Sequence, residues 1–227
     1  MDNNIPNHLG VIIDGNRRWA KEKGLSALEG HKKGLDILKS LIRWSKDKGV
    51  KILTIYIFSI ENWGRSKEEV SYLMSLFKKV FNENQIMAET KNIRIKIAGE
   101  REMIPEDILN IIKKIESDTI DNKGMVVNFA FSYGGRKEII HSVKEVIKKN
   151  LTGDEITEKV TSDNLYITEN VDLIIRTGKE KRLSGFLTWQ SFFSEFYFLE
   201  KYWPDFTEND LDNVLLNYSN RQRKLGK

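Results

Sequence analysis

The sequence predicts an α/β fold in which a largely parallel sheet is flanked by helices. Two observations support this. Short apolar runs of strand length alternate with longer stretches whose apolar residues recur at helical spacing. Strands joined through helices of this length need crossover connections, which make neighbouring strands parallel. We found no linker, low-complexity tract or internal repeat, so we expect one domain over residues 1–227.

Each expected element follows from its own pattern and its stop signals. Five apolar runs are too short for helices and end in turn or polar residues, at 9–13, 51–58, 93–97, 125–131 and 171–175. Helical spacing lies between them, at 34–48, 66–81, 105–120 and 136–149. Gly49 stops the first helix, Ser66 and Glu69 form a capping box for the second, and Pro105 opens the third. The aromatic-rich stretch 186–206 has no predicted element.

Polar segments follow the predicted strands, where α/β proteins with parallel sheets usually bind their ligands. These segments begin at Asp14, Ser59, Tyr133 and Arg176. The first is a carboxylate followed by a glycine turn and then by Arg17 and Arg18. Arginines bind phosphate oxygens well, and Mg²⁺ commonly bridges one carboxylate to phosphates. The pattern therefore predicts a diphosphate and magnesium site, although an ordinary capping aspartate remains the alternative.

Three further positions have both a functional and an ordinary interpretation. Arg176, Arg182 and Ser184 follow the last strand and could clamp a second diphosphate, or they could lie in a solvated loop. His31 lies near a helix start and could donate to phosphate or be incidental. Glu195 stands among aromatic residues, where a carboxylate needs a cationic partner or a metal. An ordinary ion pair would also meet that need.

Composition and missing motifs exclude several other classes. The chain is 40% hydrophobic and 31% charged, with net charge +4 and no cysteine, which is typical of a globular protein without disulfides. No apolar stretch approaches the ~20 residues of a membrane span, and no secretory leader is apparent, so we expect a cytoplasmic protein. P-loop, GxGxxG, HExxH and GxSxG patterns are absent. A nucleic-acid partner is not expected, because the arginines gather at strand ends and no binding motif occurs.

Several segments, taken together and in order, resemble the cis-prenyltransferase family, whose bacterial type member is undecaprenyl diphosphate synthase. They span nearly the whole chain: HLGVIIDGNRRWA (8–20), GHKKG (30–34), FSIENWGRS (58–66), NFAFSYGGRKEI (128–139), DLIIRTGKEKRLSGFLTWQSFFSEFYF (172–198), WPDF (203–206) and RQRKLG (221–226). The resemblance implies about six strands, a hydrophobic tunnel, a homodimer and Mg²⁺. Its substrates would be isopentenyl diphosphate and an allylic diphosphate such as farnesyl diphosphate, and its polyprenyl product would partition to the membrane. Loose association with the membrane surface would follow.

The resemblance also implies a role for each matching residue. Asp14 would be the metal-linked catalytic carboxylate, Glu195 the second metal ligand, and Asn62 would help to remove a proton. The allylic diphosphate would be bound by Gly15, Asn16, Arg17, Arg18, Trp19 and His31. The loop that closes over the substrates would contribute further substrate-binding residues: Ser59, Ile60, Glu61, Trp63 and Arg65. Isopentenyl diphosphate would be bound by Arg176, Arg182, Leu183 and Ser184. The segment RQRKLG would act near the dimer interface or the neighbouring site.

The tunnel would be lined from the helix near 67–90 and the strand 125–131. Its candidate lining residues are Leu73, Met74, Phe77, Met125, Val127, Phe129 and Phe131, each of which could equally be an ordinary core residue. The sequence departs from the family pattern at Ala27, Ile57, Ser132, Lys179 and Gly185. Members that make long chains commonly have alanine where Ile57 stands, so the bulkier side chain could shorten the tunnel.

These departures leave the product open. One hypothesis is a long-chain synthase that makes a C55 lipid carrier. The alternative is a divergent enzyme that makes a short cis-prenyl diphosphate or joins two allylic units in an irregular, lavandulyl-like coupling. A non-catalytic scaffold on the same fold is disfavoured, because such relatives typically lack the aspartate or the C-terminal arginine motif.

Overall fold

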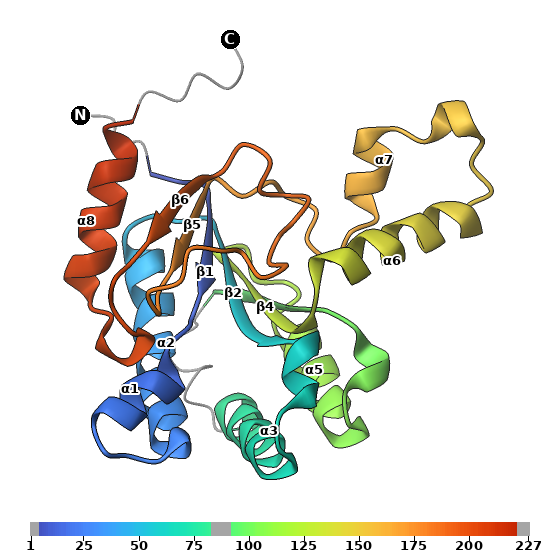
Figure 1. Cartoon of the computed structure of the whole chain (residues 1–227). Helices are drawn as coiled ribbons and strands as arrows, with labels where there is room; N and C mark the ends of the chain where they lie inside the picture. Colours follow the sequence, from blue (N-terminus) through green and yellow to red (C-terminus); the bar gives the residue numbers. More distant parts are fainter. Residues whose placement is uncertain (1–4, 83–91, 222–227) are drawn as a thin grey trace.

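The computed structural model describes residues 5–82 and 92–221. Six strands within these residues form a single sheet. Its strand order is β3-β4-β2-β1-β5-β6, and every neighbouring pair is parallel (Figure 1). The strands are β1 (His8–Ile12), β2 (Ile52–Ser59), β3 (Arg94–Ala98), β4 (Val126–Tyr133), β5 (Leu173–Arg176) and β6 (Glu195–Phe198). The expected α/β fold with a six-stranded parallel sheet is therefore confirmed.

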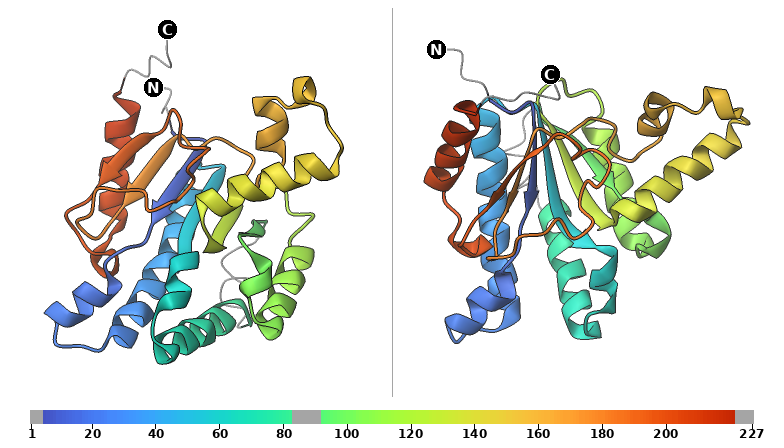
Figure 2. Two further views of the ribbon diagram at one scale, coloured as in Figure 1. Left: turned by 45° about the vertical axis from the view of Figure 1, so that its right-hand side comes forward. Right: turned by 45° about the horizontal axis from the view of Figure 1, so that its top comes forward.

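The helices pack around this sheet, apart from α6 and α7, which project from the body of the molecule (Figures 1 and 2). They are α1 (Asn16–Glu22), α2 (Ala27–Asp47), α3 (Lys67–Asn82), α5 (Glu106–Asp118), α6 (Gly135–Lys148), α7 (Glu158–Asp163) and α8 (Glu208–Ser219). In the described part of the chain, four short 3₁₀ turns accompany them: η1 (Ile60–Gly64), η2 (Arg101–Met103), η3 (Gly153–Glu155) and η4 (Trp203–Asp205). Among the described residues, no helix is both long and apolar enough to cross a membrane.

Alternate residues of the strands build two apolar layers, one on each face of the sheet. On one face Val11 packs with residues of α2, α3, α5 and α8, and this cluster is the main core. On the other face Ile12 packs with a smaller cluster that includes Tyr56, Phe186 and Leu187. That face is covered largely by irregular chain rather than by helices. Burial on both faces explains why the strand sequences are almost continuously apolar.

The structure confirms the five strands predicted from apolar runs and adds features that the pattern missed. The sixth strand, β6, lies in the stretch 186–206, and as an edge strand it is only partly buried. Helix α2 begins at Ala27 rather than near residue 34. Its start is set by a capping box in which Ser26 Oγ accepts from Glu29 N at 3.3 Å, while Glu29 Oε2 accepts from Ser26 N at 2.9 Å.

The position of β1 determines where a ligand can bind. Strand β1 pairs with β2 on one side and with β5 on the other, and the chain continues from β1 to β2 but from β5 to β6, in opposite directions across the sheet. Ile12 at the end of β1 lies beside Tyr56 and Arg176. A crevice forms where strand order reverses in this way, at the carboxyl ends of the strands. The turn that begins at Asp14 leads directly into it.

Two glycines of α2 bring this helix unusually close to the turn after β1. A Cβ atom on Gly30 would lie 2.3 Å from the Asn16 carbonyl oxygen. One on Gly34 would lie 2.2 Å from Asn16 Oδ1 and 2.9 Å from Trp203 Cδ1. These separations are shorter than van der Waals contact, so neither position has space for a side chain. Because Gly30 and Gly34 have no side chains, α2 can lie directly against Asn16, and this close contact fixes the position of Asn16.

A buried histidine cross-links the amino-terminal ends of three strands. His8 Nδ1 lies 3.0 Å from the Asn170 carbonyl oxygen and therefore donates, so Nε2 accepts from Thr54 Oγ1 at 2.7 Å. Asn128 Nδ2 in turn donates to Thr54 Oγ1 at 3.0 Å. Burial lowers the pKa of His8 below its usual 6.5. His8 therefore connects β1 and β4 through Thr54 of β2 as a neutral imidazole.

Replacing Gly34 with alanine is expected to destabilise the fold, because the added methyl group must displace Asn16 or the Trp203 ring. Such overpacking typically costs about 1–3 kcal/mol. Urea unfolding followed by circular dichroism should show a lower midpoint for Gly34→Ala. The matched control is Gly64→Ala, where a Cβ atom would meet nothing within 4 Å. Equal midpoints for Gly34→Ala and the wild type would contradict the packing described here.

Acid is expected to weaken the fold through His8. Its pKa is lower in the folded protein than in the unfolded chain, so the unfolded chain takes up the proton first. The contribution of His8 is complete above pH 6.5 and is lost as the pH falls below that value, with a slope of at most about 1.4 kcal/mol per pH unit. Urea unfolding of the wild type and of His8→Gln between roughly pH 7.5 and 5.5 should show a smaller pH dependence in the variant. Identical slopes would contradict the assignment.

Candidate active site

A cavity of about 640 Å³ opens at the carboxyl ends of β1, β2 and β5. Its polar wall comes from segments that follow the strands and from α2: Asp14, Asn16, His31, Ser59, Glu61, Asn62, Arg65, Arg176, Arg182 and Ser184. Its apolar wall comes from α2, α3, β2 and β4, with Leu35, Leu38, Ile57, Leu73, Phe77 and Phe129 among its residues. The cavity thus offers charged groups beside an extended hydrocarbon surface.

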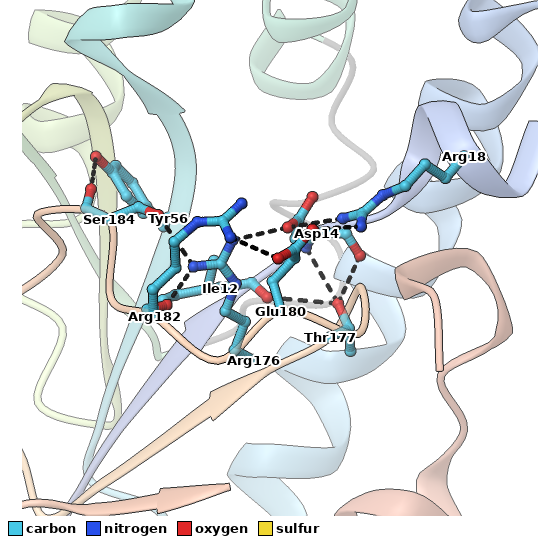
Figure 3. Close-up of polar contacts among 9 residues, drawn as sticks. All are labelled: Ile12, Asp14, Arg18, Tyr56, Arg176, Thr177, Glu180, Arg182 and Ser184. Carbon is cyan, nitrogen blue, oxygen red and sulfur yellow. Dashed lines mark hydrogen bonds and ion pairs between the residues drawn. The ribbon is translucent and has the colours of Figure 1, made fainter. Parts of the chain in front are cut away.

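Asp14 lies at the centre of the charged wall (Figure 3). Its Oδ2 is 2.8 Å from Arg176 Nη2 and 3.0 Å from Arg18 Nη2. The Asp14 backbone is fixed as well, because its carbonyl oxygen accepts from Thr177 Oγ1 at 2.8 Å. Thr177 directly follows β5, so the segments after β1 and β5 are bound to each other at Asp14. Two residues that were predicted to bind different diphosphates thus meet at one carboxylate.

Arg176 is a buried cation, with only 4% of its side chain exposed. Its Nη1 donates to Ser184 Oγ at 3.0 Å and also to the Arg182 carbonyl oxygen. Its Nε is buried and has no hydrogen-bond partner in the described part of the chain. A buried guanidinium is costly unless its donors are satisfied. The free Nε donor therefore marks a place where a further acceptor would be stabilising.

A second carboxylate, Glu180, continues the charged cluster. Glu180 Oε1 lies 2.9 Å from Arg18 Nη1, and Glu180 also pairs with Arg182. The hydrogen bond from Arg182 holds the pKa of Glu180 below its usual range. Three arginines thus surround two carboxylates, which leaves one excess positive charge. Sequence reasoning overlooked Glu180, although a lone acid within the basic run at 179–182 was a usable signal.

A separate basic cluster gathers around Glu69. This carboxylate is 2.8 Å from Arg65 Nη1, 3.4 Å from His31 Nε2 and 3.6 Å from Arg17 Nη1. Burial, followed by the charge of Arg65, lowers the pKa of His31, so the imidazole is neutral near pH 7. Glu69 N donates to Ser66 Oγ at 3.2 Å. Only this half of the predicted capping box forms, because the Glu69 side chain turns toward the cations.

The loop after β2 folds back on itself as η1. Ser59 N donates to Asn62 Oδ1 at 3.0 Å, which points the Asn62 side chain inward at the cavity wall. Trp63 faces a different way: its ring packs edge-on against Phe58, and its Nε1 donates to Ser132 Oγ at 3.0 Å. The loop therefore presents Ser59, Glu61 and Asn62 to the cavity and uses Trp63 as an anchor.

Several predicted site residues do not line the cavity. Trp19, Ile60, Trp63 and Leu183 lie outside its lining, and Gly15, Arg17 and Arg18 are also absent from it, although the two arginines join the clusters above. Glu195 is at the opposite end of the sheet. It pairs with Leu173, which lies beside Leu9, whereas Arg176 lies beside Ile12, about 10 Å farther along. Within one chain, Asp14 and Glu195 are therefore not brought together, and the role of Glu195 stays a prediction.

The predicted tunnel residues divide into two groups. Leu73, Met74, Phe77, Phe129 and Phe131 line the cavity, whereas Met125 and Val127 are buried core residues outside its lining. The segment RQRKLG lies outside the described residues except for Arg221, which pairs with Glu195. Whether the cavity extends into a tunnel stays a prediction.

The departures from the family pattern occupy specific positions. Ile57 lines the cavity, and Ala27 is the first residue of α2. Ser132 and Lys179 both have left-handed backbones, with φ of 51° and 63°. Gly185 is also left-handed, and its carbonyl oxygen accepts from Gly135 N at 2.8 Å. Of these five positions, only Ile57 contributes to the cavity lining.

Comparisons with known proteins show the family to which the chain is similar. A family model described as putative undecaprenyl diphosphate synthase matches residues 12–226. An isoprenyl transferase of Thermotoga maritima is 42% identical over 98% of this chain and 97% of its own length. One from Lactococcus lactis is 41% identical over 98% and 93%.

Solved structures are similar over the whole fold. Lavandulyl diphosphate synthase from Lavandula x intermedia, in complex with dimethylallyl diphosphate, gives a TM-score of 0.94 at 36% identity and covers 100% of both chains. A probable undecaprenyl diphosphate synthase from Campylobacter jejuni gives 0.84 at 31% identity and covers 99% of this chain and 100% of its own. Because the family model covers most of the chain and these relatives are 31–42% identical over nearly its whole length, this chain belongs to the undecaprenyl diphosphate synthase family of isoprenyl transferases.

Proposed function

We propose that this protein is a magnesium-dependent cis-prenyltransferase that condenses isopentenyl diphosphate with an allylic diphosphate. The observation that carries this proposal is the two-sided cavity, in which an arginine cluster meets an extended apolar wall. Both substrates have the same division into a diphosphate and a hydrocarbon. Family membership supports the reaction class, and the dimethylallyl diphosphate bound to the lavandulyl diphosphate synthase supports an allylic substrate.

The arginines would bind the diphosphates and stabilise the charge that develops as one of them leaves. Arg18 and Arg176 already converge on one carboxylate, and Arg182 lies beside them through Glu180. Fixed cations at the point where negative charge develops are among the strongest catalytic devices in enzymes. As the allylic diphosphate departs, the double bond of isopentenyl diphosphate attacks the allylic carbon. The C–O bond breaks, a C–C bond forms, and a proton is lost to give the new cis double bond.

Asp14 is the residue that would hold Mg²⁺. No group of three or more metal-binding side chains exists among the described residues, so the protein alone forms no complete metal cage. Magnesium commonly binds through one or two carboxylates together with substrate phosphates and water, which fits a single aspartate facing this cavity. Both ion pairs of Asp14 use Oδ2. When bound, the metal would supply positive charge to the diphosphate.

Proton removal would take place beside Asn62. In this structure its Oδ1 accepts from Ser59, so the amide is oriented by the loop. A neutral amide is too weak a base to act alone. Asn62 would therefore orient the departing proton toward a phosphate oxygen or water.

We propose undecaprenyl diphosphate as the product, in line with the family model. The alternative, a short or irregular product, is favoured by two observations: Ile57 contributes a branched apolar side chain to the cavity lining, and the similarity to lavandulyl diphosphate synthase is high. A long polyprenyl product would partition into membranes, which would bring the enzyme to their surface.

We also propose a homodimer. Phe192, Phe193 and Phe196 are exposed next to or within the edge strand β6, and Phe192 is 83% exposed. Exposed aromatic residues beside an edge strand form an apolar surface that tends to associate with other chains, so proteins normally cover such a surface. A second copy is the occupant we propose, because Arg221, which begins the predicted interface segment, pairs with Glu195 of the same strand.

Asp14→Ala is expected to abolish chain elongation, with kcat/KM lower by about a hundredfold or more, because the carboxylate serves both metal and arginines. The assay supplies labelled isopentenyl diphosphate, Mg²⁺ and either farnesyl or dimethylallyl diphosphate. Chromatography of the product gives its length, and a ladder ending near C55 would exclude the short-chain alternative. Asp118→Ala, which removes an exposed surface carboxylate, is the control. Folded wild-type protein that elongates no starter would overturn the proposal.

Phe192→Glu is expected to weaken the dimer, because a charge would be placed in an apolar contact. Light scattering should give a mass near twice 26.5 kDa for the wild type and a lower mass for the variant at micromolar concentration. Ile120→Glu, at an exposed apolar residue after α5, should leave the wild-type mass unchanged. A wild type that stays monomeric at every concentration tested would contradict the dimer.

A further inference from the structure

The segment Tyr202–Asp205 holds helix α1 against the cavity, although none of its residues lines that cavity. The motif at 203–206 is part of the family resemblance, yet the proposed chemistry gives it no task. In the structure this segment follows β6 and includes η4. It contacts the turn after β1, the middle of α1 and the end of α1. It is therefore placed to control where α1 lies.

Helix α1 needs such support. It has only seven residues, and its N-cap, Gly15, provides no side-chain hydrogen bond. Helices this short are not stable alone and depend on tertiary contacts. Yet α1 supplies Asn16 to the cavity lining, Arg17 to the cluster around Glu69 and Arg18 to the cluster around Asp14. A small shift of α1 would therefore disturb both charged clusters at once.

The contacts with the segment are distributed along α1. Trp203 N donates to the Asp14 carbonyl oxygen at 3.0 Å, just before the helix. Trp19 Nε1 donates to Asp205 Oδ1 at 2.7 Å. The Tyr202 hydroxyl donates to Glu22 Oε1 at 2.5 Å, near the end of the helix. Of these, the bond between Trp19 and Asp205 involves the residue next to Arg18.

That bond changes how Trp19 must be understood. The resemblance implies that Trp19 contacts the allylic diphosphate. In the structure the single donor of its indole is occupied by Asp205, and Trp19 is absent from the cavity lining. An indole has no other polar group to offer a phosphate. The only polar group of the Trp19 side chain is therefore already hydrogen-bonded to η4.

We propose that Trp19 and Asp205 are a pair of positioning residues that hold α1 so that Asn16, Arg17 and Arg18 meet the substrate diphosphate. Trp19 acts by anchoring the helix, and Asp205 acts only through Trp19. This inference rests on the proposed prenyl transfer for its catalytic readout, but the pair itself is defined by geometry.

A double-mutant cycle tests the pair. Asp205→Ala and Trp19→Phe should each lower kcat/KM by roughly three- to tenfold, as expected for the loss of one solvent-exposed hydrogen bond. The double variant should be no worse than either single variant, because Asp205 has no task once the indole donor is gone. Asp205→Asn keeps a carbonyl acceptor and should restore most of the activity. Asp163→Ala, on α7, is the control, since it removes only an exposed ion pair.

A second readout does not depend on activity. The chain has five tryptophans, so its indole N–H region should contain few NMR signals, and the one missing in Trp19→Phe belongs to Trp19. That signal should move in Asp205→Ala and return toward its wild-type position in Asp205→Asn. Calorimetric titration with dimethylallyl diphosphate should show weaker binding for Asp205→Ala and Trp19→Phe.

The outcomes separate the two proposals. Additive losses in the double variant, or Asp205→Asn as poor as Asp205→Ala, would overturn the pair, and so would an unmoved indole signal. A wild type that elongates no substrate would overturn the proposed function alone, and the indole signal together with the calorimetric titration would then decide the pair. The melting temperature of each variant should also be measured, so that a loss of activity caused by unfolding is recognised.

Discussion

The ion pair between Asp14 and Arg176 is the interaction on which the site depends. Arg176 lies at the end of a central strand with almost no exposed surface, so its charge must be compensated within the protein. Asp14 supplies that compensation, and the Ser184 hydroxyl and the Arg182 carbonyl accept hydrogen bonds from Nη1, which leaves Nε as the donor without a partner among the described residues. Removing one partner of such a pair leaves an uncompensated buried charge, which is strongly destabilising. The catalytic carboxylate is thus part of the fold as well as part of the proposed chemistry.

Both charged clusters are arranged as carboxylates that gather cations from different elements. Asp14 and Glu180 gather arginines from α1, β5 and the loop after β5, whereas Glu69 gathers the cations Arg17 and Arg65 together with the neutral imidazole of His31. Without the carboxylates, the like charges of these cations would repel one another. With them, the cations are held close together while retaining an excess positive charge around Asp14. A site organised in this way is suited to an incoming diphosphate, because less reorganisation is needed when the anion binds.

The loop after β5 shows the backbone cost of this arrangement. Lys179, Ser184 and Leu187 all have positive φ, a region that side chains other than glycine rarely adopt. Such conformations cost about 1–3 kcal/mol each and persist where the surrounding structure enforces them. Here Leu187 is fully buried, and Ser184 accepts from the buried Arg176. The strain thus lies in the segment that brings Arg182 and Ser184 to the cavity.

The sequence by itself determined the elements and the chemistry of the strand ends. Apolar periodicity is a local property, so it predicted five of the six strands and their parallel pairing. The polar residues that follow β1, β2 and β5 then had to lie at one edge of the sheet. The edge strand β6 escaped this reasoning because its four residues are only partly buried and lie within a longer aromatic-rich stretch that hides the limits of the strand. Only the tertiary structure decided which of these side chains meet. Glu180 joins the cluster around Asp14, and the Glu69 side chain pairs with Arg65 in place of completing its capping box. Trp19 is hydrogen-bonded to Asp205, and Glu195 lies at the amino-terminal end of β6, away from Asp14. These outcomes depend on distances between segments far apart in the chain, which are set by packing, such as that of α2 on Asn16, and not by any local pattern.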